Sequence, residues 1–168
     1  MQTSRSCSWE QLPPDMLARI ASLLDRNEVA TSLRRVNKAA AAQFSGPEHT
    51  TVHLSQPVPP SDFAAHWLAP GTTRGLTLKQ RRQLPCLAAA SGVVANLQVA
   101  LQAVGCTLMT HKVFEAGAAS GKLFSCQWLW QQGCPTGPEQ YGSSGLLGTA
   151  AGGGHLHLSV LAGLEPPN

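Results

Sequence analysis

Aromatic and charged side chains are scarce in this chain of 168 residues. Only 5% of the residues are Phe, Trp or Tyr and only 12% are charged, whereas 43% are hydrophobic. This composition suits a folded chain, but it leaves few large side chains for one extensive core. The net charge of +3 is too small to require a nucleic acid or a membrane surface as a partner. The basic pairs at 34–35 and 81–82 are therefore interpreted as solvated helix faces.

Long hydrophobic runs and export signals are also missing. No stretch approaches the roughly 18 consecutive apolar residues that a membrane span needs, and the first residues lack the apolar segment of a secretory signal. The five cysteines include no Cys-x-x-Cys pair, which indicates reduced thiols. Cys126 and Cys134 have no partnered His and are predicted to be packing residues. We expect a cytoplasmic or nuclear protein with no membrane span and no nucleic-acid partner.

Side chains that could perform chemistry are thinly spread. Asp and Glu number nine, and beyond residue 115 only Glu139 and Glu165 remain. His155 and His157 have the spacing of two metal ligands on one side of a strand, but no further ligand is clustered near them. The glycines at 152–154 are not followed by the Lys-Ser/Thr of a phosphate-binding loop. We therefore expect no catalytic residue, no metal and no cofactor, and hence no enzyme.

The strongest helical pattern lies within residues 12–36. Aliphatic residues recur there at steps of three and four, which predicts a helix that begins at the prolines and ends near Asp25. Asn27 is the predicted N-cap of a second helix that continues to the end of this stretch. Asn37 is predicted to cap a third, alanine-rich helix that ends around Phe44.

Leu-Pro opens this stretch, spaced aliphatic residues and Leu-Asp follow, and a second aliphatic set leads to Val-x-Lys. This order over residues 9–45 resembles an F-box, a three-helix module that binds the small adaptor subunit of a cullin-type ubiquitin ligase. The late Trp of many F-boxes is absent, its place falling within 39–42, so we expect weaker adaptor binding. The resemblance implies adaptor-binding roles for Leu12, Pro13, Leu17, Ile20, Leu24, Val29, Leu33 and Val36. A module this short also cannot bury its own aliphatic stripe, so it needs a partner.

Residues 46–84 are predicted to form a connector because prolines interrupt them repeatedly. At most one short strand is expected, at 51–55. A short helix is predicted over 62–69 with Ser61 as its N-cap. Phe63 and Trp67 lie four residues apart on this helix, and we expect them to dock it onto a neighbour.

From residue 78 onward the sequence predicts helix pairs that repeat. The first helix spans 78 to about 90, is capped by Thr77 and contains Pro85, which should kink or interrupt it. Small residues followed by glycine recur at 87–92, 116–121 and 149–154. A second apolar helix is predicted after each of these glycines, at 93–105, 122–133 and 155–164.

An alanine-rich helix, a tight glycine turn and a second apolar helix resemble the ankyrin repeat. The closest matches are 118–123 and 151–156, which stand where that family has Ala-Ala-x-x-Gly-His-Leu, whereas its Thr-Pro-Leu-His opening is missing. The resemblance covers residues 85–164, and residues 165–168 form a tail.

An ankyrin array needs about three repeats to form its core. This one has only two to three, about two and a half, so we expect marginal C-terminal stability. We also expect either a truncated gene product or an array completed by packing against the preceding segments.

The ankyrin resemblance also implies a target-binding surface made by the finger tips and the first helices. It selects His111, Lys112, Glu115, Gln140 and Tyr141, with Phe124 and Trp130 as an added exposed aromatic patch. Trp128 and Leu129 are expected in the inter-repeat core.

We therefore predict an all-α adaptor that has an F-box-like three-helix module, a connector and a short ankyrin-like array, and that recruits an unknown target protein to a ubiquitin ligase. One alternative is a plain ankyrin scaffold whose F-box-like helices cap the array. Another is a metal-dependent lipid phosphodiesterase relative that uses His155 and His157, because divergent ankyrin arrays are sometimes grouped with sphingomyelin phosphodiesterases.

Overall fold

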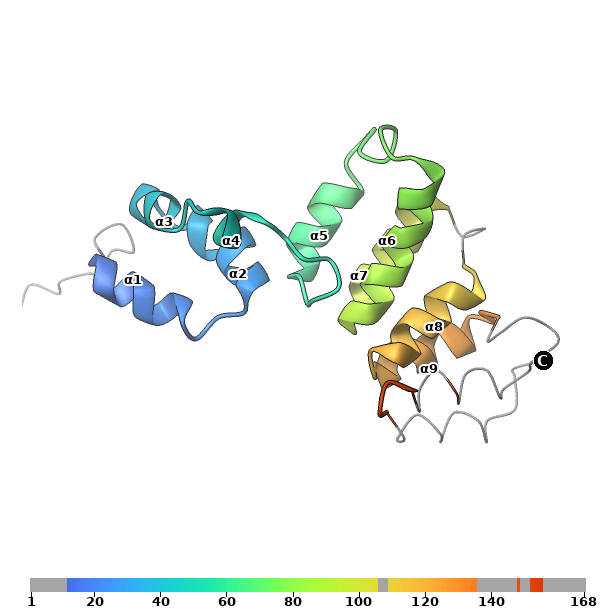
Figure 1. Ribbon diagram of the computed structural model, residues 1–168. Coiled ribbons are helices and arrows are strands. Elements are labelled where there is room, and N and C mark those ends of the chain that lie inside the picture. The colour runs from blue at the N-terminus through green and yellow to red at the C-terminus, as the bar shows by residue number, and fades with distance from the viewer. Residues whose placement is uncertain (1–11, 106–108, 136–147, 149–151, 156–168) are drawn as a thin grey trace, which may run out of the picture. The chain divides into compact units, whose positions relative to one another are not determined.

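The computed structural model describes residues 12–105, 109–135, 148 and 152–155 (Figure 1). Regular secondary structure in these residues is entirely helical, as the sequence predicts. The helices are α1 (Pro14–Ala21), α2 (Arg26–Thr31), the 3-10 helix η2 (Leu33–Arg35), α3 (Lys38–Gln43), α4 (Pro47–Thr50), α5 (Pro60–Trp67), α6 (Leu78–Ser91), α7 (Val94–Val104), α8 (His111–Ala119) and α9 (Leu123–Gln131). None of these described helices is long and apolar enough to span a bilayer.

The chain divides into two compact units between His53 and Leu54. Unit 1 is Met1–His53 and contains α1 to α4, and unit 2 is Leu54–Asn168 and contains α5 to α9. The boundary therefore falls within the predicted connector, and the helix of that connector belongs to unit 2.

Helix α1 begins at the prolines as predicted but ends at Ala21, four residues before Asp25. The prediction of Asn27 as the N-cap of the next helix is wrong, because Asp25 has that role. The N–H of Asp25 donates to Glu28 Oε2 at 3.1 Å, and the two residues form a reciprocal capping box. The Asp-x-x-Glu spacing is the sequence signal that would have located this cap.

Asn27 is instead a fully buried residue within α2. Its Nδ2 donates to His53 O at 2.8 Å, and its Oδ1 accepts from the N–H of His53 at 2.9 Å. A buried amide needs such partners because an unpaired polar group costs free energy. These two hydrogen bonds hold the last residue of unit 1 against α2.

The rest of unit 1 follows the predictions in part. The second helix, expected to continue to residue 36, is divided into α2 and η2. Asn37 caps α3 as predicted, since its Oδ1 accepts a hydrogen bond from the N–H of Ala40 at 2.7 Å. Helix α4 was not predicted and begins at Pro47, a favoured residue for a first helical position. Residues 51–55, where at most one short strand was expected, form none.

The described residues of unit 2 form two helix pairs and one preceding helix, α5 (Figure 1). Helices α6 and α7 form the first pair, and α8 and α9 form the second. The first helices, α6 and α8, pack on one another, the second helices, α7 and α9, do the same, and α5 packs on α7. This arrangement agrees with the first two of the repeated helix pairs that the sequence predicts, whereas the third, at 149–164, lies largely outside the described residues.

Pro85 does not interrupt α6, which is continuous from Leu78 to Ser91. A proline inside a helix costs about 3 kcal/mol because it removes one hydrogen bond and its ring crowds the preceding turn. Burial of Leu84, Ala88 and Ala89 on the same stretch offsets this cost. The predicted cap at Thr77 is confirmed by a capping box with Gln80.

Left-handed glycines end the helices as the repeated pattern predicts. Gly92 follows α6 with a φ of +84°, and Gly121 follows α8 with a φ of +68°. At the second of these ends, the N–H of Lys122 donates to Gly117 O at 2.9 Å, which completes a Schellman motif. Gly133 ends α9 with a φ of +69°.

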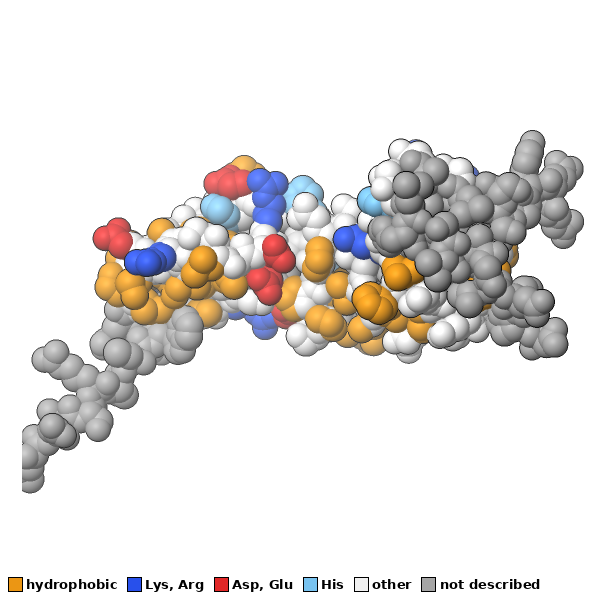
Figure 2. Space-filling model, turned by 90° about the horizontal axis from the view of Figure 1, so that it is seen from below, with side chains coloured by type: hydrophobic (Ala, Val, Ile, Leu, Met, Phe, Trp, Pro, Cys, Tyr) orange, Lys and Arg blue, Asp and Glu red, His pale blue; other side chains and the backbone are white. Residues whose placement is uncertain are grey.

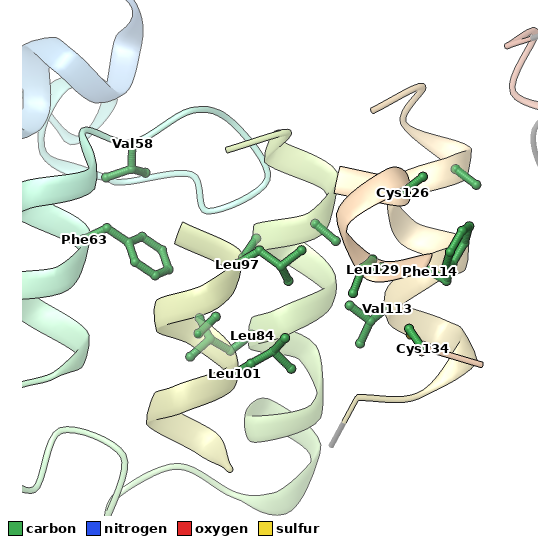
Figure 3. Packing of buried hydrophobic residues seen from close by; sticks show 14 residues of the cluster. Val58, Phe63, Leu84, Leu97, Leu101, Val113, Phe114, Cys126, Leu129 and Cys134 are labelled. Carbon is green, nitrogen blue, oxygen red and sulfur yellow. The ribbon is translucent and has the colours of Figure 1, made fainter. Parts of the chain in front are cut away.

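The core of unit 2 runs from α5 across both helix pairs (Figure 3). Phe63 of α5 points toward α7 and is only 2% exposed, and Trp67 packs beside it. Both rings therefore dock this helix as predicted, although its N-cap is Pro59 and not Ser61. The Nδ2 of the buried Asn96 donates to the carbonyl of Val58 at 2.8 Å, which anchors the entry to α5. Helix α5 thus covers the first pair on the side of α7.

Candidate interaction surfaces

The residues that the F-box resemblance selects have different environments in unit 1. Leu17, Val29 and Leu33 are 0%, 3% and 4% exposed and form a small core together with Ala40 and Phe44. A side chain that is fully covered by its own module stabilises the module and offers no surface to a partner. These three predicted adaptor contacts are therefore placed in the interior.

The remaining selected residues keep accessible surface. Leu12, Ile20 and Leu24 pack against the small core but are only partly buried. Pro13 and Val36 are exposed, and Val36 has 38% of its surface accessible. These five side chains can contact a partner without unfolding the unit.

Two further apolar side chains extend this surface although they were not selected. Met16 is 50% exposed and Leu23 is 83% exposed. Both belong to the aliphatic stripe of the sequence, so the stripe would have identified them. We call the following set the α1 surface: Leu12, Pro13, Met16, Ile20, Leu23 and Leu24. Figure 2 shows hydrophobic side chains gathered on unit 1, and such a gathering is typical of an interaction site.

An open hollow lies at the start of α3. It has a volume of about 530 Å³ and is lined by Val36, Asn37, Lys38 and Ala39. The place of the missing F-box Trp falls at 39–42, where only alanines stand. The hollow therefore adjoins the position at which this sequence departs from the F-box pattern.

The residues that the ankyrin resemblance selects lie mainly on α8 of unit 2. Lys112 is exposed, and His111 and Glu115 are partly buried. The thiol of Cys86 on α6 is influenced by the charges of both Lys112 and Glu115. Side chains of the two first helices therefore share one surface.

The predicted aromatic patch is reduced to one residue. Phe124 is 74% exposed on α9, as expected. Trp130, by contrast, is partly buried and meets the edge of Phe114, with ring centroids 6.5 Å apart and an interplanar angle of 73°. Leu129 is fully buried in the core as predicted, and Trp128 packs against that core. Gln140 and Tyr141 lie outside the described residues.

The described cysteines of unit 2 are free thiols. Burial raises the pKa of Cys126 and that of Cys134 from about 9 to about 12, so both thiols stay protonated at neutral pH. Burial also raises the pKa of Cys86, while the nearby Lys112 opposes this shift. Because the thiolate is the reactive form, these environments suit packing and not nucleophilic catalysis.

His155 has a packing role that fits its place in the repeat. A Cβ added at Gly121 would lie 2.6 Å from Nδ1 of His155, so the imidazole covers this glycine. In the preceding pair, a Cβ added at Gly92 would lie 2.8 Å from Cδ of Lys122. The same relation therefore occurs twice. Lys122 follows Gly121 and covers Gly92. His155 follows Gly154 and covers Gly121. His157 lies outside the described residues, and no group of three or more potential metal ligands occurs among the described ones.

The raised thiol pKa values predict that unit 2 loses stability in alkali. The unfolded chain deprotonates its thiols near pH 9, whereas the folded chain holds those protons until about pH 12. The unfolded state therefore binds fewer protons across this interval, and the free energy of unfolding falls as the pH rises through it. Urea denaturation at pH 7.5 and pH 10.5 measures the fall. The Cys126→Ala variant should show a smaller fall, and an unchanged fall would exclude the thiol as its cause.

Comparison of this chain with protein-family models, curated proteins and solved structures found no match. The F-box and ankyrin resemblances consequently depend on the motifs in the sequence. The structure supports the coarser description of an all-helical chain with two compact units.

Proposed function

We propose that this chain is a non-enzymatic adaptor of a cullin-type ubiquitin ligase. In this function unit 1 binds the small adaptor subunit of the ligase, and unit 2 holds a target protein. The observation that carries the proposal is the α1 surface, where Met16 and Leu23 are exposed beside a small core that is already complete. The F-box-like order of residues supplies the identity of the partner.

The α1 surface has suitable chemistry for a stable contact. Burying one exposed Leu or Met side chain contributes about 1.5–3 kcal/mol. Leu23 and Met16 have most to gain from burial, and the partly accessible Ile20 and Leu24 enlarge the contact. The hollow beside Val36 provides a second point at which the partner can approach the unit.

Recruitment needs no chemistry from the chain itself. A target held on unit 2 is tethered to the ligase through unit 1, so its local concentration at the ligase rises. Helix α8 of unit 2 presents the predicted target contacts Lys112, His111 and Glu115. Phe124 adds an exposed aromatic ring on α9.

The experiment is a binding measurement between the full chain and the purified ligase adaptor subunit. We expect the Met16→Asp/Leu23→Asp variant to bind at least tenfold more weakly, because both carboxylates would have to be desolvated in the interface. Both side chains are exposed, so circular dichroism should show unchanged helix content. Leu78→Asp is the matched control, since Leu78 is also exposed, at 58%, but belongs to unit 2. A folded wild-type chain that does not bind the adaptor would refute the ligase function.

A plain interaction scaffold is the second candidate, and one observation favours it. Helix α5 packs on α7 and places Phe63 in the core, so unit 2 has a covering helix of its own on that side. Unit 2 can then bind a partner whatever unit 1 does. Target binding without adaptor binding would identify this function.

A further inference from the structure

Acidic residues are missing from a long part of unit 2. Between Asp62 and Glu115 the sequence contains no Asp or Glu. The same interval contains five basic residues, namely Arg74, Lys79, Arg81, Arg82 and Lys112. Four of them lie within residues 74–82, in the turn before α6 and in the first turns of that helix. This part of unit 2 is consequently strongly basic although the whole chain is only weakly so.

One of these basic side chains is used within the fold. Arg81 donates from Nε to Leu76 O at 3.2 Å and from Nη2 to Thr73 O at 2.9 Å. These hydrogen bonds fix the turn that leads into α6, and with it the position of Arg74. The guanidinium of Arg81 is therefore a support for the surface and is only partly accessible.

We define a basic face of unit 2 by three side chains, those of Lys79, Arg82 and Lys112. Successive residues of a helix are rotated by about 100°, so Lys79 and Arg82 lie on the same side of α6 as Cys86. The opposite side of α6 carries buried residues such as Leu84 and is turned to the core. Helix α8 packs on α6, and its Lys112 lies near Cys86 of α6, where its charge opposes the rise that burial causes in the pKa of that thiol. The basic face therefore crosses from α6 to α8, and Glu115 contributes one negative charge at its edge.

Within the part of the chain that the structure describes, the side chains of the basic face have no acidic partner. All three are exposed, and no carboxylate of the described residues lies within 4.0 Å of any of them. Lys79 also stands in the first turn of α6, where the helix dipole disfavours a positive charge. This arrangement costs stability in the isolated chain, and a negatively charged ligand would remove the cost.

We propose that the basic face binds an acidic segment of a protein. The proposal names the chemical class of the target and rests on the recruiting function proposed for unit 2. Three charges on two packed helices match a short run of Asp and Glu, and Leu78 and Leu87, which are 58% and 38% exposed, flank the charges on α6. Apolar residues next to the carboxylates of the segment can contact these two leucines.

Other anionic partners fit the basic face less well. Single-stranded nucleic acid is held by aromatic side chains on which bases stack. Among the described residues of unit 2 the exposed aromatic ring is Phe124, which is on α9 and not on α6 or α8. An anionic membrane binds amphipathic helices, whose apolar residues lie together along one edge of the helix surface. Leu78 and Leu87 are nine positions apart, which places them on opposite sides of α6, so they form no such edge.

The test measures fluorescence anisotropy of a fluorescein-labelled 15-residue peptide of Glu, Asp and Leu with the full chain. We expect binding that weakens at least tenfold in the Lys79→Glu/Arg82→Glu variant. The matched control is Arg19→Glu/Lys38→Glu, which changes the net charge equally through two exposed residues of unit 1. The control should change the dissociation constant less than twofold.

Three results would overturn the proposal. The first is no binding of the acidic peptide, and the second is an equal loss in both variants, which would mean that only net charge matters. The third is tighter binding of a 15-nucleotide single-stranded DNA, or of vesicles that contain phosphatidylserine, than of the peptide. The measurement needs no ligase adaptor, so its failure is distinct from a failure of adaptor binding by unit 1.

Discussion

Replacing Phe114 with alanine is expected to lower the free energy of unfolding of unit 2 by about 3–5 kcal/mol. Phe114 is fully buried in the core of unit 2, on the side of α8 that faces away from the first helix pair (Figure 3). Its ring also meets the edge of Trp130, a geometry that adds to the free energy of burial. Truncation would remove this packing and leave a cavity that the short helices α8 and α9 cannot fill completely.

Urea denaturation followed by tryptophan fluorescence measures this effect, because Trp67, Trp128 and Trp130 all lie in unit 2. Phe124→Ala is the matched control, since it removes the same atoms from a ring that is 74% exposed. We expect the control to change the free energy of unfolding by less than about 0.5 kcal/mol. Similar losses in the two variants would contradict the placement of α8 and α9.

Local signals in the sequence predicted the helices of this chain well. Asn37 and Thr77 were identified correctly as N-caps. An N-cap hydrogen bond joins the side chain of one residue to the backbone of the next helical turn, so it can be recognised from adjacent residues. Asn27 was misassigned because its partner, His53, is 26 positions away in the sequence. Pro85 was expected to kink or interrupt α6, and the interruption does not occur, because the burial that keeps this helix continuous is a tertiary effect.

The candidate surfaces were predicted less completely than the helices. A helical stripe shows which residues share a side, but it does not show how deeply each is covered. Leu17 and Met16 belong to the same stripe of α1, yet the first is 0% exposed and the second is 50% exposed. Trp130 was expected on the surface because ankyrin repeats often have a polar residue at the corresponding position. Its contact with Phe114 of the adjacent helix depends on packing that periodicity does not encode.

The surfaces of the two units differ in chemistry. The α1 surface of unit 1 is apolar, whereas the basic face of unit 2 carries Lys79, Arg82 and Lys112. An apolar surface gains affinity from the area that it buries, while a charged face mainly gives specificity and rapid association. This difference suits a permanent partner on unit 1 and an exchangeable target on unit 2, and it predicts that salt weakens only the second interaction.

Replacing Gly121 with alanine is expected to destabilise unit 2 by about 2–5 kcal/mol, which is the second of the two largest expected effects. Its φ of +68° costs any residue with a Cβ about 1–2 kcal/mol. The added Cβ would also lie 2.6 Å from Nδ1 and 2.9 Å from Cγ of His155, so the imidazole must move. Crowding of this kind adds about 1–3 kcal/mol.

Gly133→Ala separates these two contributions. Gly133 has nearly the same φ, +69°, but nothing lies within 4 Å of a Cβ added there, so it should lose only the backbone contribution of about 1–2 kcal/mol. Thermal or urea unfolding of both variants, and of Gly121→Ala/His155→Ala, measures the difference. The double variant should recover part of the loss, because removing the imidazole relieves the crowding. Equal losses in the two single variants would mean that His155 does not pack on the turn between α8 and α9.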